Sequence, residues 1–127
     1  MKKNILIFLI FVFLFFLSAC GNNYYSKKGS YFIKNGSIYL QNKVVIGKYD
    51  YFDGWYSLNF KVNGSYMVNF LCEDNVKVKI YDNYGEEMFD MDKSNNKSII
   101  EKYNGNLNVE FDANESKTGF RLEFIEQ

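Results

Sequence analysis

Alternation of apolar and polar side chains at every second position is the feature that most restricts how this chain can fold. The clearest case is the segment 76–80, in which valine and isoleucine alternate with lysine. Because successive side chains of a strand point to opposite faces, this pattern predicts a half-buried strand. The same period recurs in segments 56–62, 66–70, 107–111 and 120–124, and no segment after residue 20 keeps a helical period. The chain is therefore expected to be all-β.

Residues typical of turns separate these segments. Asn35-Gly36 lies between the expected strands 30–34 and 37–40, and Asn-Gly is the strongest signal for a two-residue hairpin. Asn63-Gly64 is predicted to turn the chain before residue 66. With a further short strand at 43–49, about eight strands follow one another at short spacing. This order favours an antiparallel β-sandwich or jelly roll over an alternating βαβ fold.

The inward face of the alternating segments is predicted to form the core. Cys72 ends the alternation that starts at residue 66, so it is expected to point inward as a small hydrophobic residue. A domain of this size buries about 65% of the surface of its unfolded chain, so it needs no disulfide. The predicted core residues are Tyr66, Val68, Phe70, Val78, Ile80, Leu107, Val109, Phe111, Phe120, Leu122 and Phe124.

The first twenty residues have the composition of an export signal. Lys2 and Lys3 precede an unbroken apolar run at 5–17. The run is shorter than the roughly 20 residues that span a bilayer, and it fits the apolar region of a secretory signal. The sequence Leu-Ser-Ala-Cys at 17–20 then resembles a bacterial lipobox. This resemblance implies that Cys20 carries a diacylglycerol; the alternative is an ordinary signal peptide cut after Ala19.

The lipobox predicts three parts: a signal peptide at 1–19, a lipidated Cys20 with a short tether at 20–29, and a β-sandwich domain at 30–127. The mature protein would be held outside the cytoplasm on a bacterial membrane by its N-terminal lipid. Because each buried CH2 of an acyl chain contributes about 0.8 kcal/mol, two or three chains anchor a protein without a transmembrane helix. The sequence leaves open whether the membrane is the inner or the outer one.

The composition argues against several functions. The chain has no histidine, which removes the most common general base and metal ligand, and it has no nucleophile elbow or phosphate-binding loop. We therefore expect no enzymatic activity and no cofactor. Its formal net charge is zero, whereas nucleic-acid binding requires a basic face.

The segment 56–124 resembles a CUB domain. The resemblance lies in Tyr-Ser-Leu at 56–58, in Val-Lys-Ile-Tyr-Asp-Asn at 78–83, in the block 106–112 and in Gly-Phe-Arg-Leu at 119–122. It implies a β-sandwich, and the pre-peptidase C-terminal domain is a comparable family. Many CUB domains bind calcium through an Asp before the Ile-Tyr-Asp strand and another after the last block. Here Val76 stands at the first place and only Asp112 matches the second.

A loop at 90–101 spaces oxygen-bearing side chains as an EF-hand calcium loop does. Its sixth position is Asn95 instead of glycine, its eighth is Lys97 instead of an apolar residue, and its flanks are predicted strands. A solvated polar connection without a metal is therefore the favoured interpretation, and a calcium site is the alternative. Its candidate ligands are Asp90, Asp92, Ser94, Ser98 and Glu101.

An aromatic cluster at 49–56 provides candidate ligand contacts. Tyr51, Asp53 and Trp55 could form a platform that stacks on a sugar, with the carboxylate accepting hydroxyl protons. The alternative is a strand whose aromatic residues are core, with Asp53-Gly54 as a turn. These observations predict a lipid-anchored envelope protein with a small binding or adhesion module for a protein or a glycan. The alternatives are a structural or inhibitory envelope component and a calcium-binding β-sandwich domain.

Overall fold

The computed structural model describes residues 25–127, and these residues form eight strands and no helix. The predicted signal peptide and the lipidation site Cys20 lie outside the described residues. Within the described part of the chain, no helix is long and apolar enough to cross a membrane. The strands are β1 (Tyr25–Lys34), β2 (Ser37–Gln41), β3 (Val44–Lys48), β4 (Tyr51–Cys72), β5 (Val76–Tyr81), β6 (Glu87–Met91), β7 (Lys97–Ser116) and β8 (Phe120–Glu126).

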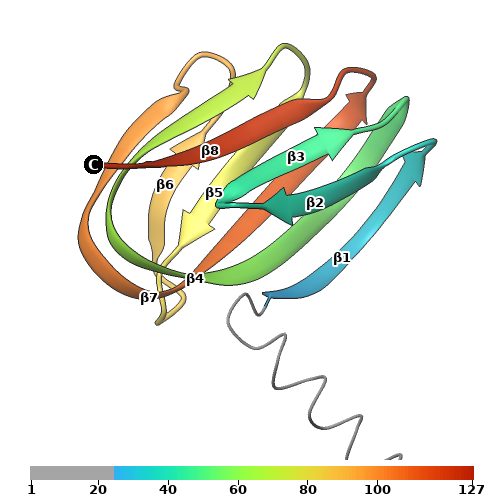
Figure 1. Cartoon of the computed structure of the whole chain (residues 1–127). Coiled ribbons are helices and arrows are strands. Elements are labelled where there is room, and N and C mark those ends of the chain that lie inside the picture. Colours follow the sequence, from blue (N-terminus) through green and yellow to red (C-terminus); the bar gives the residue numbers. More distant parts are fainter. Residues whose placement is uncertain (1–24) are drawn as a thin grey trace, which may run out of the picture.

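All eight strands belong to one antiparallel sheet that folds over into two layers (Figure 1). One layer consists of β1, the first half of β4, the second half of β7, β5 and β6. The other consists of β2, β3, β8, the second half of β4 and the start of β7. The predicted all-β sandwich is confirmed. The long strands β4 and β7 contribute to both layers, which the sequence did not indicate.

The predicted turn at Asn63-Gly64 is wrong, because β4 continues through it as a strand of 22 residues. The register with β7 shifts between Gly64 and Tyr66, and Gly64 has a φ of 139° that favours glycine. The Tyr66 hydroxyl donates to the carbonyl oxygen of Asn63 at 2.9 Å, and the Ser65 hydroxyl accepts the N–H of Lys102 in β7 at 2.9 Å. Asn-Gly therefore bends the strand from one layer into the other without ending it.

The predicted hairpin at Asn35-Gly36 is also wrong. β1 pairs with β4 and β2 pairs with β3, so these two residues carry the chain from one layer to the other. Glycine is needed at position 36 because a Cβ there would lie 1.9 Å from the carbonyl oxygen of Lys48. The two-residue hairpin of the structure is Asn42-Lys43 between β2 and β3, with φ angles of 49° and 60°.

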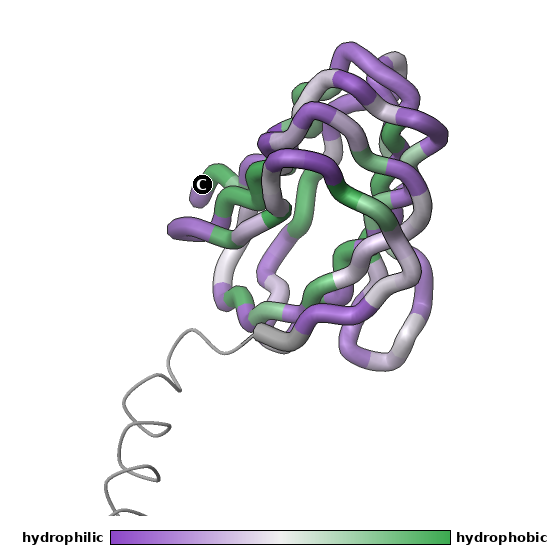
Figure 2. The backbone as a smooth tube through the Cα atoms, turned by 90° about the vertical axis from the view of Figure 1, so that its right-hand side faces the viewer, coloured by the Kyte–Doolittle hydropathy of each residue, from purple (hydrophilic) through white to green (hydrophobic). Residues whose placement is uncertain are grey.

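The core fills the space between the layers. All eleven predicted core residues are buried, and they are joined by others from β2, β3 and β4 such as Ile38, Val45 and Phe52. Short hydrophobic and hydrophilic stretches alternate along the chain (Figure 2). Cys72 is half-buried against the core as a free thiol, and burial raises its pKa. β1 begins at Tyr25, five residues before the predicted start of the domain, so part of the predicted tether is strand.

Candidate ligand-binding site

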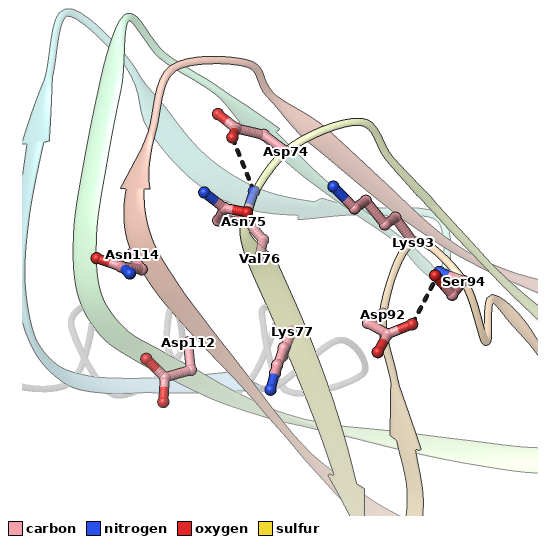
Figure 3. A pocket seen from close by; sticks show the side chains of 9 residues that line it. All are labelled: Asp74, Asn75, Val76, Lys77, Asp92, Lys93, Ser94, Asp112 and Asn114. Atoms are coloured by element: carbon pink, nitrogen blue, oxygen red, sulfur yellow. Dashed lines mark hydrogen bonds between the residues drawn. The ribbon is translucent and has the colours of Figure 1, made fainter.

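A cavity of about 460 Å³ opens at the end of the first layer where β5 begins and β6 ends (Figure 3). Its lining comes from the strands β5 and β7 and from the loops that precede β5 and follow β6. Its lining residues comprise three aspartates, two lysines, two asparagines, one serine and one valine. The lining residues are Asp74, Asn75, Val76, Lys77, Asp92, Lys93, Ser94, Asp112 and Asn114.

The strand register places an aromatic residue beside this cavity. Trp55 of β4 is paired with Asp112 of β7, and Asp112 is paired with Lys77 of β5. Directly paired residues of neighbouring strands share one face, with their Cβ atoms about 5 Å apart. Trp55 is 39% exposed on the outer face of the layer. An indole ring, a carboxylate and an ammonium group therefore form one row across three strands.

Asp74 fastens the loop before β5 to the loop after β7. One carboxylate oxygen accepts the N–H of Asn75 at 2.8 Å, and the other accepts the N–H groups of Lys117 and Thr118. These backbone donors, that of Lys117 above all, lower the pKa of Asp74. The thiol of Cys72 donates to the Asp74 carbonyl oxygen at 3.3 Å. Asp74 thus stabilises the wall of the cavity as an ionised carboxylate.

Asp92 has the same role in the loop after β6. Its Oδ1 accepts the N–H groups of Ser94 and Asn95, both at 2.8 Å. The donors of Asn95 and Ser94, followed by the charge of Lys77, lower the pKa of Asp92. The loop is closed further by the N–H of Asp92, which donates to the carbonyl oxygen of Asn95 at 3.0 Å.

The candidate calcium ligands are divided between the two layers. Asp90 lies on β6, whereas Ser98 and Glu101 lie on the first part of β7, which pairs in the other layer. Among residues 25–127, no group of three or more acidic or cysteine side chains is placed to hold a metal ion. The segment 90–101 with the EF-hand-like spacing therefore crosses from one layer to the other. The oxygens of its candidate ligands are not gathered around one point.

Tyr51, Asp53 and Trp55 lie on the outer face of β4, which is paired with β1 on one side and with β7 on the other. The rings of Tyr51 and Phe32 meet edge to face with their centroids 5.9 Å apart. Asp53 accepts the N–H of Glu115 at 3.0 Å, which supports a bulge where Glu115 has a φ of 51°. Desolvation and then the charges of Asp53 and Glu115 raise the pKa of Tyr51. Asp53-Gly54 does not turn the chain, because β4 runs through it.

The amino-acid sequence alone does not single out Lys77, Lys93 or Asn114 as ligand contacts. Lys77 has the pattern of the polar side of a strand, and Asn114 lies on another strand. Only the pairing of β5 with β7 brings Lys77 to Asp112, and the N–H of Asn114 donates to the carbonyl oxygen of Asn75 at 3.0 Å. No local pattern in the sequence indicates this proximity.

Comparison with known proteins identifies no family: no family matches this chain, and no curated protein is significantly similar to it.

Proposed function

We propose that this protein is a lipid-anchored bacterial envelope protein whose β-sandwich is a non-enzymatic ligand-binding module outside the cytoplasm. The anchor is supported by the charged start, the apolar run and the Leu-Ser-Ala-Cys sequence that ends at Cys20. The binding role is supported by one observation above all: Trp55, Asp112 and Lys77 form a row at the border of a polar cavity.

A glycan is the ligand class that this row fits best. The face of an indole packs on the apolar face of a sugar ring, while carboxylate, amide and hydroxyl groups bond its hydroxyls. Asp112 and Asn114 supply such groups from a strand, and Ser94 supplies one from a loop. The cavity lies within the range of about 300–1,000 Å³ that is usual for small-ligand sites. Its mixed charges favour a neutral or zwitterionic sugar over a polyanion.

A glycan-binding screen of residues 21–127 tests the ligand. We expect Trp55→Ala and Asp112→Asn each to weaken binding about tenfold, equivalent to about 1.4 kcal/mol. Tyr84→Ala is the matched control, because Tyr84 is an exposed aromatic residue on the β5–β6 turn, at the opposite end of β5 from the cavity. Binding that survives both site substitutions would refute the assignment of this site.

Metabolic labelling with a fatty acid tests the anchor. The protein should take up the label, and Cys20→Ala should abolish it. Processing as an ordinary signal peptide after Ala19 would instead leave the mature protein unlabelled.

A second candidate function is that of a structural or inhibitory envelope component with a protein partner. The outer face of the second layer carries a row in which Ile125 pairs with Met67 and Met67 with Ile99. Ile99 is 64% exposed, and Leu71, four residues beyond Met67 on β4, is 52% exposed. Exposed apolar patches of this kind mark sites of protein association. Loss of a partner on Ile99→Lys, with sugar binding absent, would favour this function.

A further inference from the structure

The start of β1 and the β5–β6 turn lie at the same end of the molecule (Figure 1). Tyr25, the first residue of β1, is paired with Phe60 of β4, and Phe60 is paired with Leu107 of β7. The next residue of β7, Asn108, is paired with Tyr81, the last residue of β5. Three strand spacings of about 4.8 Å therefore separate the start of β1 from the turn, roughly 14 Å. The candidate ligand site lies at the other end, where β5 begins.

The chain between the lipidation site and β1 is short. Cys20 precedes Tyr25 by five positions. A fully extended chain covers at most about 3.6 Å per residue, so these positions span no more than about 18 Å. β1 itself has ten residues and is about 33 Å long. The anchored end of the sandwich is thus confined near the lipid headgroups, whereas the far end extends away from them.

The β5–β6 turn displays an aromatic side chain that the fold does not use. Tyr84 is 88% exposed. The turn beneath it is held by Asp82, whose Oδ1 accepts the N–H groups of Tyr84 at 2.8 Å and Glu86 at 2.9 Å. The N–H of Asn83 donates to the hydroxyl of Tyr103 at 2.8 Å. The ring is therefore presented on a well-bonded turn and has no core to pack against.

We propose that the end of the sandwich formed by the β5–β6 turn rests on the lipid surface, with the ring of Tyr84 among the headgroups. This inference rests on the proposed lipid anchor. Tyrosine is enriched at membrane–water interfaces, where one end of the ring is in apolar and the other in polar surroundings. The short tether supplies the high effective concentration that one aromatic contact needs. In this orientation the row of Trp55, Asp112 and Lys77 faces away from the membrane.

Charge is a minor part of this contact. The exposed lysines at this end, Lys27, Lys28, Lys61 and Lys102, are accompanied by the exposed Glu86 and Glu101 and by the half-buried Asp82. The attraction of these lysines to anionic headgroups is thus offset by the repulsion of the nearby carboxylates. The contact of the β5–β6 turn with the lipid surface should therefore depend on the tether and change little with salt concentration.

Fluorescence quenching by brominated lipids tests the orientation. The full chain is expressed in a bacterium that lipidates proteins, and the purified product is reconstituted in phosphatidylcholine vesicles brominated close to the headgroup. Trp55 is the single tryptophan, so Trp55→Phe gives a silent background. Tyr84→Trp is then compared with Ser94→Trp, which reports from the loop at the opposite end. A third variant carries Tyr84→Trp and about ten flexible residues inserted after Gly21.

We expect the indole introduced at position 84 to be quenched about twofold or more, as a side chain at headgroup depth should be. The indole introduced at position 94 should keep its intensity, and the inserted linker should reduce quenching at position 84. Equal quenching at the two positions would overturn the inference while leaving the anchor intact. Mass spectrometry of the same samples shows whether Cys20 carries acyl chains. A Cys20 without acyl chains would overturn the proposed anchor and the orientation with it.

Discussion

The buried hydroxyl groups of Tyr49 and Ser116 offer a quantitative test of how the two layers are joined. Tyr49 follows β3 in one layer, and Ser116 ends β7 in the other. Their oxygens are 2.8 Å apart, and Ser116 is fully buried. Ser116 also donates to the carbonyl oxygen of Thr118 at 2.9 Å. Because the serine has one proton and gives it to Thr118, the Tyr49 hydroxyl must donate to Ser116.

This direction predicts unequal effects of two small substitutions. Ser116→Ala leaves the buried Tyr49 hydroxyl without an acceptor, which should lower the free energy of unfolding by about 1–3 kcal/mol. Tyr49→Phe removes the hydroxyl and leaves the Ser116–Thr118 hydrogen bond, at a cost of about 0.5–1.5 kcal/mol. When both are combined, no phenol is left unpaired. Tyr49→Phe should therefore be neutral or stabilising in the Ser116→Ala background.

Urea unfolding of the wild type, both single variants and the double variant at pH 7 gives the coupling energy. We expect about 1 kcal/mol or more between the two positions, as for groups in one hydrogen-bond network. Strict additivity of the two single effects would refute the assignment of donor and acceptor.

The pH dependence is a second readout of the same pair. Burial, partly opposed by the Ser116 hydrogen bond, raises the pKa of Tyr49 to about 12. An unfolded tyrosine loses its proton near pH 10, so the folded protein retains a proton that the unfolded chain has released. The contribution of Tyr49 to stability is therefore fully present below pH 10. The free energy of unfolding falls by about 1.4 kcal/mol per pH unit between pH 10 and pH 12. Tyr49→Phe lacks this loss, so the wild type should be the more stable protein at pH 8 and the less stable one above about pH 11. A constant difference across this range would contradict the buried phenol.

Three further predictions concern packing, backbone approach and metal. Phe111→Ala should lower the free energy of unfolding by about 3–5 kcal/mol in urea unfolding, because the ring is fully buried and stacks on Phe120. Gly36→Ala should destabilise the protein far more than Gly85→Ala. A Cβ at Gly36 collides with backbone, whereas Gly85 has open space and bears only the strain of a φ of 81°. Equal losses in the free energy of unfolding would contradict this reasoning. The thermal midpoint should be the same in chelator and in millimolar calcium, and a rise in calcium that Asp92→Asn abolishes would restore the calcium interpretation.

The sequence predicted the fold class because the alternation is a local consequence of burying one face of a strand. Val78, Phe111 and Leu122 could be assigned to the core from their neighbours alone. The connections could not be assigned in this way. Asn35-Gly36 and Asn63-Gly64 have the residues of tight turns, yet one joins the layers and the other bends a continuous strand.

The pairing of distant strands decided these cases. β1 gains ten paired residues with β4, which a hairpin with the five-residue β2 could not supply. The real hairpin, Asn42-Lys43, has a weaker local signal, because lysine rarely adopts a positive φ. The candidate site shows the same limit. Trp55 was identified from its type, whereas Lys77 joins it only through two strand registers.

The sharing of β4 and β7 between the layers has a consequence for how the chain reaches its structure. Pairs such as Phe52 with Ser116 close loops that include most of the domain, and each layer needs both long strands before its sheet is complete. Each layer thus combines segments that are far apart in the sequence, and refolding should be slow for a chain of this length. The chain contains no proline, so no prolyl isomerisation adds a second slow step. A chain with this topology should therefore stay unfolded for longer than a chain of the same length that is built from local hairpins.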